Sequence, residues 1–249
     1  HGLATAEEGE AACAAVRAAG AADVQFFRGD MRDVSAIDAL VNNVRAWGPV
    51  DILVNNAGIQ HTAPLADMPR DTWEAILAIN LSAAFHTMQA FMPDMAARGF
   101  GRVINIASVH GLVASKDKAP YVAAKFGLVG LSRVAALEYA SAGTKASGGV
   151  TVNCIAPGWT ETAIIQPQIE ARAAHHGGNR DAGIAELLGE KQPSLRTSDP
   201  EEIGALALWL LSFAYTARTV PAIHDISTDL ADPPQFKSLA LRADYLDQI

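Results

Sequence analysis

Three side chains in the sequence have the types and the spacing needed for proton transfer at a hydroxyl or carbonyl group. Tyr121 and Lys125 lie four residues apart at the start of a predicted helix, so the phenol and the ammonium share one helix face. A cation near a tyrosine favours the phenolate and lowers its pKa, and a phenolate accepts a proton from an alcohol. Ser108 ends a predicted strand and could hold the reacting oxygen by a hydrogen bond. The same pattern also fits an ordinary helix N-terminus with a half-buried tyrosine and a surface lysine.

The elements that must position these residues alternate along the chain. Strands are predicted at 23–28, 51–54, 102–107 and 150–155, and helices at 5–19, 33–47, 72–97, 121–139 and 201–211. Strands joined by crossover helices predict a doubly wound, Rossmann-like α/β fold, in which helices cover both faces of a parallel sheet. Such sheets bind ligands at the carboxyl ends of their strands. Polar segments follow the predicted strands at Asp30, 55–60, 108–110 and 157–162.

Composition and charge narrow the class of protein. The 249 residues are 50% hydrophobic and 18% charged, which supplies a core and argues against disorder. The net charge of −8, without a basic stripe, argues against nucleic-acid binding. Cys13 and Cys154 lie far apart with no metal-ligand spacing, so both are expected to be buried thiols in a reducing compartment. The first ten residues resemble no secretory signal, and a cytoplasmic location is expected.

Two segments suggest alternatives that we do not favour. The run 75–93 carries no charge, but it contains Asn80 and other polar residues and ends in a proline, so a buried helix is expected rather than a membrane span. His175 and His176 suggest a metal site. Adjacent histidines point apart on a helix, and no acidic or cysteine partner has ligand spacing, so histidines in a loop and no metal are expected.

Several motifs occur together in an order that narrows the function. NNAG at 55–58 follows the apolar run VDILV, Pro-Gly at 157–158 follows TVNCIA, and Asn80 lies in the long uncharged helix. Twelve residues separate Ser108 from YVAAK at 121–125. The set resembles the short-chain dehydrogenase/reductase family over residues 1–212, and the segment 213–249 is expected to be an atypical tail. The resemblance implies an oxidoreductase that uses a nicotinamide dinucleotide.

The resemblance also assigns roles to individual residues. It implies that Tyr121 is the general acid/base, that Lys125 lowers the tyrosine pKa and binds the nicotinamide ribose, and that Ser108 orients the substrate oxygen. Asn80 would hold a water molecule that relays protons through Lys125. The implied cofactor is NAD, with NADP as the alternative, and no metal is required because the nicotinamide accepts the hydride. The residues implied to contact the cofactor are Asp30, Met31, Asn56, Ala57, Gly58, Tyr121, Lys125, Pro157, Gly158 and Thr162.

Within the family, the runs NNAGIQH, GRVINIASVHGLVAS and KAPYVAAKFG resemble the bacterial D-3-hydroxybutyrate dehydrogenases. This resemblance implies interconversion of D-3-hydroxybutyrate and acetoacetate in a homotetramer, with a substrate lid at 161–192. A small 3-hydroxy acid has a carboxylate that lysine, imidazolium and amide groups can fix. The implied substrate contacts are Gln60, Ser108, His110, Lys118 and Gln168.

The sequence departs from the family pattern in three places. It opens after the family's first strand and TGxxxGxG turn, whose helix carries the pyrophosphate. The turn at 142–149 is longer than usual, and the tail lacks the family's glycine-containing ending. Two alternatives therefore stay open. One is a family member that acts on another small alcohol, such as a sugar acid or acetoin, and the other is a non-catalytic remnant that keeps only the substrate half.

Overall fold

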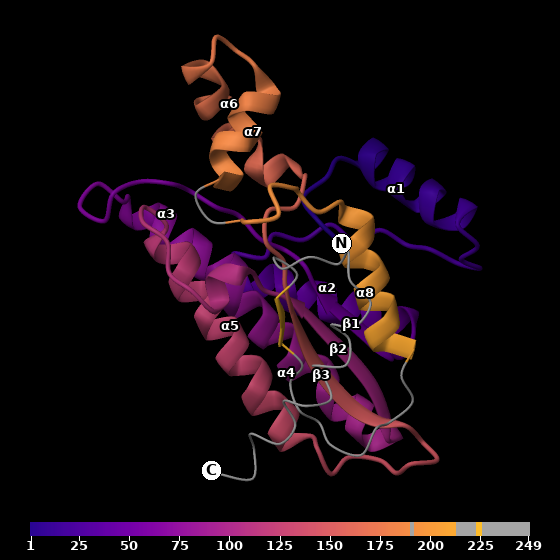
Figure 1. Cartoon of the computed structure of the whole chain (residues 1–249). Helices are drawn as coiled ribbons and strands as arrows, with labels where there is room; N and C mark the ends of the chain where they lie inside the picture. Colours follow the sequence, from indigo (N-terminus) through magenta and orange to yellow (C-terminus); the bar gives the residue numbers. More distant parts are fainter. Residues whose placement is uncertain (190–191, 213–222, 226–249) are drawn as a thin grey trace.

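A parallel sheet of four strands forms the centre of the molecule. The computed structural model describes residues 1–189, 192–212 and 223–225. The strands occur in the order β1-β2-β3-β4 (Figure 1), and they are β1 (Ile52–Asn55), β2 (Phe100–Ile106), β3 (Gly149–Ala156) and β4 (Ile223–Asp225). Strands β2 and β3 are buried along almost their whole length, as expected for central strands of a parallel sheet covered on both faces.

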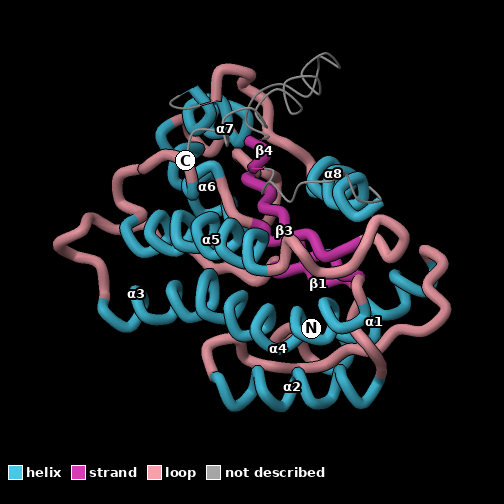
Figure 2. The backbone as a smooth tube through the Cα atoms, turned by 90° about the horizontal axis from the view of Figure 1, so that it is seen from below, coloured by secondary structure: helices cyan, strands magenta, loops and turns pink. Residues whose placement is uncertain are grey.

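Helices cover both faces of this sheet (Figure 2). On one face lie α4 (Ala83–Arg98) and α5 (Ala119–Glu138), with α2 (Val34–Trp47) packed outside α4. On the other face lies α8 (Pro200–Ser212), whose Leu210 packs against Ile104 and Ile155 of the sheet. The N-terminal helix α1 (Ala6–Ala18) projects from one edge of the molecule (Figure 1). The predicted doubly wound α/β fold is therefore confirmed.

Helix boundaries follow from local sequence. Asp33 caps α2 by accepting a hydrogen bond from the backbone N–H of Ser35. Helix α4 ends at Gly99, whose φ of 72° is a left-handed conformation that costs glycine little. Pro120 lies in the first turn of α5, where a backbone N–H would have no partner within the helix. These signals fix the start of α2, the end of α4 and the start of α5.

The uncharged run belongs to one long helix interrupted by a π turn. Helix α3 (Arg70–Leu77) continues through the π turn Ala78–Ser82 into α4. By length and composition this helix could cross a membrane, but 44% of its most apolar 18-residue stretch is buried within the fold. Ile76, Met92 and Met95 are almost completely buried. The helix expected for the run 75–93 is therefore present, and its apolar side chains contribute to the core.

The strand predicted at 23–28 is absent. Arg28 makes only a single isolated bridge to Gly2, and the N–H of Gly29 donates to the Gly2 carbonyl at 3.2 Å. A strand requires a neighbour that offers several consecutive backbone partners, and in the described part of the chain Gly2 offers only this one pairing. Periodicity alone did not reveal that the neighbour was missing.

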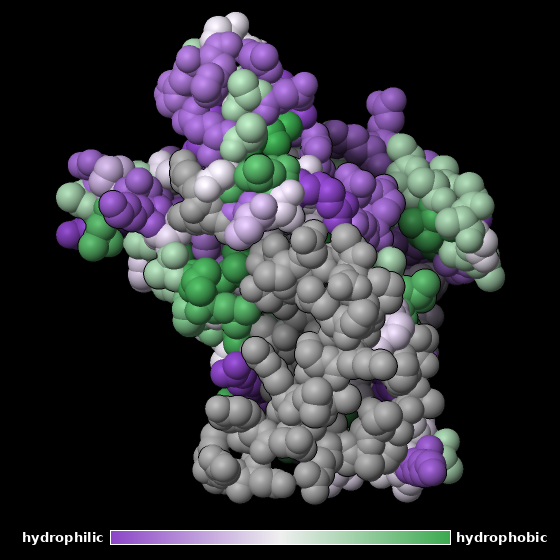
Figure 3. All heavy atoms as spheres, viewed as in Figure 1, coloured by the Kyte–Doolittle hydropathy of each residue, from purple (hydrophilic) through white to green (hydrophobic). Residues whose placement is uncertain are grey.

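The segment 161–192 is more helical than expected. It contains the 3₁₀ turn Ala163–Ile165 and the helices α6 (Gln166–His175) and α7 (Arg180–Gly189). These two helices pack on each other and project above the sheet as a largely hydrophilic lobe (Figures 1 and 3). Most of the predicted tail 213–249 lies outside the described residues. Within it, β4 pairs in parallel with β3, so the sheet extends into this segment.

A buried chain of polar side chains connects the sheet to α4 and α5. The Asn105 side chain on β2 is fully buried; its Oδ1 accepts from Asn55 Nδ2 and its Nδ2 donates to Ser132 Oγ, both at 2.8 Å. Thr87 of α4 donates to Asn55 Oδ1 at 2.7 Å. Because buried polar groups are costly without partners, these bonds fix how both helices sit on the sheet.

We expect Ser132→Ala to destabilise the fold by about 1–3 kcal/mol, because it leaves a donor of the buried Asn105 amide without its oxygen partner. Urea unfolding monitored by circular dichroism measures the free energy of unfolding. The matched control is Ser141→Ala at an exposed position, which should change it by less than about 0.5 kcal/mol. Equal effects of the two substitutions would contradict a stabilising role for this network.

Candidate active site

The structure brings Ser108, Tyr121 and Lys125 together at the carboxyl end of β2. Ser108 follows β2 and accepts a hydrogen bond from the backbone N–H of His110 at 3.1 Å, while Tyr121 and Lys125 lie in the first two turns of α5. All three side chains are buried. Burial raises the pKa of Tyr121, and a hydrogen bond with Ser108 partly opposes that rise. The pKa shift is opposite in direction to the one expected from a neighbouring cation.

Lys125 is held by the sheet itself. Its Nζ donates to the Ile106 carbonyl of β2 at 2.7 Å and lies 5.6 Å from the centre of the Tyr121 ring. Burial lowers the pKa of Lys125 to about 8, and the nearby Cys154 thiol partly opposes the shift. At neutral pH the side chain still carries its proton. It therefore places a positive charge close to the Tyr121 ring.

Asn80 lies in the π turn and fixes the loop that follows β1. Its Oδ1 accepts from the Ile59 N–H and its Nδ2 donates to the Ile59 carbonyl, both at 2.9 Å. A Cβ placed on Gly58 would lie 3.8 Å from Asn80 Oδ1 and 3.9 Å from Lys125 Nζ, so this loop passes close to both side chains. The side-chain amide of Asn80 is thus bound to the backbone of this loop. The water-binding role expected for Asn80 stays a prediction.

Two basic side chains expected to contact substrate are buried, His110 against Tyr121 and Lys118 against Trp159. The His110 and Tyr121 rings meet edge to face with centroids 6.2 Å apart, and Lys118 Nζ lies 4.6 Å from the Trp159 ring. The Lys118 and His110 side chains are only 5% and 6% exposed. A buried ammonium is a hydrogen-bond donor with the charge needed to bind an anion, and the imidazole next to Tyr121 can add a second donor.

The two amides expected to contact substrate come from different loops. Gln60 is half-buried in the loop after β1, and Gln168 lies in the first turn of α6. The Nε2 of Gln168 is buried and makes no hydrogen bond within the described residues. An unpaired buried donor costs about 1–3 kcal/mol, which a hydrogen-bonding ligand would recover.

Trp159 connects the segment after β3 to the lobe formed by α6 and α7. Its backbone N–H donates to Gln192 Oε1 at 3.2 Å, and its backbone carbonyl accepts from the Ser198 N–H at 2.8 Å. Its ring packs with Ile169 and Leu187 of the lobe. Gln192 was not predicted as a site residue. It lies in the polar run EKQPS at 190–194, where nothing in a single sequence distinguishes it from its neighbours.

The residues expected to hold the cofactor occupy two regions. A cavity of about 270 Å³ beside β1 is lined by Met31, Asn56, Ala57 and Asn80, among others. Asp30, next to Met31, pairs with Arg32 at 2.6 Å, and this pairing lowers its pKa to about 2. The apolar walls of this cavity and the side-chain amides of Asn56 and Asn80 could hold an adenosine group. In the second region Pro157, Gly158 and Thr162 follow β3.

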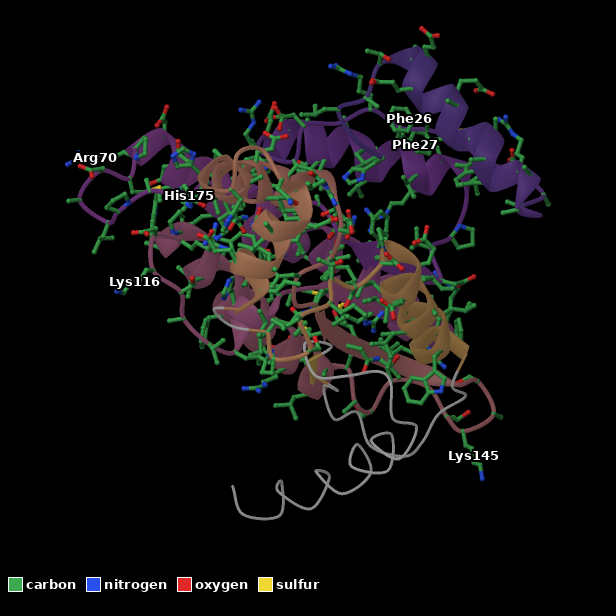
Figure 4. The ribbon with its side chains drawn as sticks, turned by 45° about the horizontal axis from the view of Figure 1, so that its top comes forward. Phe26, Phe27, Arg70, Lys116, Lys145 and His175 are labelled. Carbon is green, nitrogen blue, oxygen red and sulfur yellow. The ribbon has the colours of Figure 1, made fainter. Side chains whose placement is uncertain are left out.

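The two adjacent histidines do not behave as expected. His175 ends α6 and His176 caps it, yet both contact the same carboxylate, Glu186 of α7, at 3.3 and 2.8 Å. The expectation that they point apart is wrong because the helix ends between them. Figure 4 shows His175 on the same side of the molecule as Arg70 and Lys116. In the described residues no group of three His, Cys, Asp or Glu side chains could hold a metal ion.

Comparison with known proteins agrees with this arrangement. The family model for short chain dehydrogenases matches residues 3–173. The chain belongs to the short chain dehydrogenase family. It is 47% identical to a D-beta-hydroxybutyrate dehydrogenase of Cupriavidus necator over 192 residues, which cover 77% of this chain and 72% of that protein. A second D-beta-hydroxybutyrate dehydrogenase, from Rhizobium meliloti, is 42% identical over 182 residues, covering 73% of this chain and 68% of the relative.

Solved structures of this short chain dehydrogenase family share its fold. A gluconate 5-dehydrogenase from Burkholderia cenocepacia in complex with NADP and tartrate superposes with a TM-score of 0.71 at 30% identity. The match covers 84% of this chain and 76% of the other. As a short chain dehydrogenase with a Rossmann fold, the chain has the architecture that binds a nicotinamide dinucleotide.

The lowered pKa of Lys125 predicts a pH-dependent stability. Between about pH 8 and its ordinary value of 10.5, native Lys125 has lost its proton whereas the unfolded lysine keeps it, so stability rises with pH. We expect this rise, roughly 2 kcal/mol up to about pH 10, to be missing in Lys125→Met. Below about pH 8 both states are protonated and the difference between the two proteins is constant.

Urea unfolding at steps between about pH 7 and pH 10 measures this difference. The control is the same substitution at an exposed lysine: Lys145→Met should keep the pH dependence of the unsubstituted protein. Parallel pH profiles for the unsubstituted protein and Lys125→Met would show that the buried amine does not carry the shift.

Proposed function

We propose that this chain interconverts D-3-hydroxybutyrate and acetoacetate with NAD(H), using Tyr121 as the general acid/base. The observation that carries the proposal is a pair of buried side chains: His110, whose ring meets the Tyr121 ring edge to face, and Lys118, which lies three residues before Tyr121 and on the Trp159 ring. They would bind a carboxylate a short distance from the atom that exchanges a proton. The similarity to two D-beta-hydroxybutyrate dehydrogenases supports the same substrate.

In the proposed complex the carboxylate orients the substrate. Lys118 supplies the charge, since its three N–H donors can move from the Trp159 face to an anion. Gln60 and Gln168 would add directed amide donors from two sides, and Gln168 has a buried N–H ready for this purpose. Binding through Lys118, His110 and the two glutamines, which come from different segments of the chain, would fix the hydroxyl-bearing carbon relative to Tyr121.

In the oxidising direction Tyr121 takes the proton of the substrate hydroxyl, and Ser108 holds that oxygen by a hydrogen bond. The bound nicotinamide supplies the hydride acceptor. Because burial raises the pKa of Tyr121, its phenolate depends on the positive charge of Lys125. In the reducing direction the phenol returns the proton to the oxygen of acetoacetate. Asn80 would hold the water that connects Lys125 to solvent.

We propose that the cofactor spans the carboxyl edge of the sheet from the cavity beside β1 to the segment after β3. Met31, Asn56 and Ala57 line that cavity, and Asp30 is the residue before Met31 in the chain. The remaining proposed contacts are Gly58, Tyr121, Lys125, Pro157, Gly158 and Thr162. NAD is the proposed form, whereas two solved relatives were determined with bound NADP.

A homotetramer in the cytoplasm is proposed for the working form. Helices α4 and α5 expose apolar side chains that a second copy would cover: Phe85 is 42% exposed, Phe126 45%, Val134 51% and Leu137 71%. Exposed apolar surface of this extent favours association, and closed symmetric assemblies are the usual outcome.

A sugar acid is the second candidate substrate. Three solved relatives with 27–30% identity to this chain are described as gluconate or putative gluconate dehydrogenases. A sugar acid also has a carboxylate that Lys118 and His110 could bind. Its longer polyhydroxyl chain would require more hydrogen-bonding groups than the proposed contacts Gln60, Ser108, His110, Lys118 and Gln168 offer.

The test is NADH formation by this chain from NAD with D-3-hydroxybutyrate, L-3-hydroxybutyrate or gluconate. Turnover selective for the D-acid is expected. Turnover of gluconate alone would establish the sugar-acid alternative, and absence of turnover with all three would favour a non-catalytic protein. Repeating the assay with NADP tests the proposed cofactor preference.

Removing the phenol should remove the chemistry. We expect Tyr121→Phe to lower kcat by about 10²- to 10⁴-fold, the usual contribution of a general acid/base, while the circular dichroism spectrum and thermal unfolding stay close to those of the unsubstituted protein. Steady-state NADH formation measures the loss. Retained turnover in this variant would exclude Tyr121 as the proton-transfer group.

Removing the carboxylate contact should affect the acid selectively. We expect Lys118→Ala to raise the KM for D-3-hydroxybutyrate roughly 10- to 100-fold, because a charged hydrogen bond contributes about 1.5–3 kcal/mol, and to change the KM for NAD little. The matched control is Lys116→Ala, since Lys116 is exposed and lies only two residues away (Figure 4). Equal rises in both KM values would argue against a carboxylate contact.

A further inference from the structure

The backbone immediately before Lys118 has an unusual conformation. Asp117 has a φ of 63°, and among the described residues only Asp117 and Leu195 combine a positive φ with a side chain other than glycine. This left-handed region is disfavoured for residues with a Cβ, although aspartate tolerates it better than most. Such backbone strain is often found at functional sites.

The reversal at Asp117 determines where Lys118 lies. The chain leaves an exposed loop at Lys116, turns at Asp117 and enters α5 with Lys118 as the N-cap. Across this single turn the side chains change from exposed to 5% exposed, and Lys118 Nζ comes to lie on the Trp159 ring. An ordinary right-handed or extended conformation at Asp117 would send the following side chain in another direction.

The same residue joins two loops of the site. The Asp117 carbonyl accepts a hydrogen bond from the Ala63 N–H at 2.9 Å. Ala63 lies three residues after Gln60, in the loop that follows β1. The backbone of Asp117 therefore ties the loop with the proposed amide contact to the turn with the proposed lysine contact.

The carboxylate of Asp117 has no evident purpose of its own. It is exposed, and no hydrogen bond or ion pair joins it to another residue within the part of the chain that the structure describes. A negative charge next to Lys118 would also oppose an incoming anion. The residue type thus fits the backbone conformation better than it fits the charge of the site.

We propose that Asp117 is a positioning residue: its left-handed backbone directs Lys118 onto the Trp159 ring, where the substrate carboxylate is proposed to bind, and its carbonyl holds the Gln60 loop. The link to substrate binding rests on the proposed function, whereas the link to the placement of Lys118 does not. Asp117 itself contacts neither substrate nor cofactor.

The test compares substitutions that separate backbone from side chain. Asp117→Gly and Asp117→Asn keep access to the left-handed region, whereas Asp117→Val opposes it by about tenfold in population. Asp117→Ala gives a milder version should the valine variant fold poorly. Thermal unfolding of every variant shows which ones are folded at the assay temperature.

The first measurement is the rate at which acetic anhydride acetylates Lys118. The full chain is labelled in its folded state and then digested, and mass spectrometry of the peptides follows the acetylation. Exposed Lys145 and buried Lys125 provide the fast and slow references within each sample. Lys118 should be protected in the unsubstituted protein and in the glycine and asparagine variants. In Asp117→Val it should react about tenfold faster. Protection of Lys118 in the valine and alanine variants would overturn the proposal.

The second measurement is the affinity for acetoacetate by isothermal titration calorimetry. The valine variant should bind about tenfold more weakly, the glycine variant should bind like the unsubstituted protein, and the asparagine variant should bind equally or more tightly because a negative charge is lost. Weakening in the glycine variant as large as in the valine variant would assign the effect to the side chain and overturn the proposal.

The two measurements separate this inference from the proposed function. Unchanged acetoacetate affinity in Lys118→Ala would contradict the carboxylate contact, yet the acetylation rates would still decide whether Asp117 positions Lys118. Conversely, a weakened Lys118→Ala together with a protected Lys118 in Asp117→Val would leave the carboxylate contact in place and reject the role of Asp117.

Discussion

The hydrogen bond between Lys125 and the Ile106 carbonyl constrains the rest of the site. A buried ammonium needs an acceptor, and this one comes from the last residue of β2. The bond fixes α5 against the strand end, two residues before Ser108, and so brings Ser108 next to Tyr121 one helical turn before Lys125. Ser132 and Asn105 make a second attachment between the same two elements, two turns further along α5. The geometry of the proposed proton transfer therefore depends on how α5 packs on β2.

Two buried lysines divide the electrostatics around Tyr121. Lys125 lies four residues after the tyrosine, and its positive charge would stabilise the proposed phenolate. Lys118 lies three residues before the tyrosine and contacts the Trp159 ring. In a chain with a net charge of −8, an anionic substrate gains little from the overall field. Local, desolvated cations must supply the attraction, and burial makes each of them more effective. This division of charge explains why a small carboxylate is the proposed substrate.

The lobe formed by α6 and α7 completes the site from above the sheet. Trp159 joins the lobe to the segment after β3 and places its ring on Lys118, while Gln168 has a buried donor that no other described residue pairs with. The outer surface of the lobe is hydrophilic and its inner contacts are apolar (Figure 3). A lobe of this kind can cover a bound acid and exclude water around Tyr121.

The parallel α/β architecture, the helices that flank the sheet and the pairing of Tyr121 with Lys125 could be predicted from the sequence, because periodicity, caps and four-residue spacing are local properties. Ser108 joined this pair through the motifs of the family, not through local spacing. It could not decide the missing strand at 23–28 or the shared partner of His175 and His176, since each depends on a segment distant along the chain. Only the tertiary structure decided that Lys118 lies on Trp159 and that Asp117 adopts a left-handed backbone. Contacts between distant segments and the strain they impose are set by packing, which a single sequence does not encode in any local pattern.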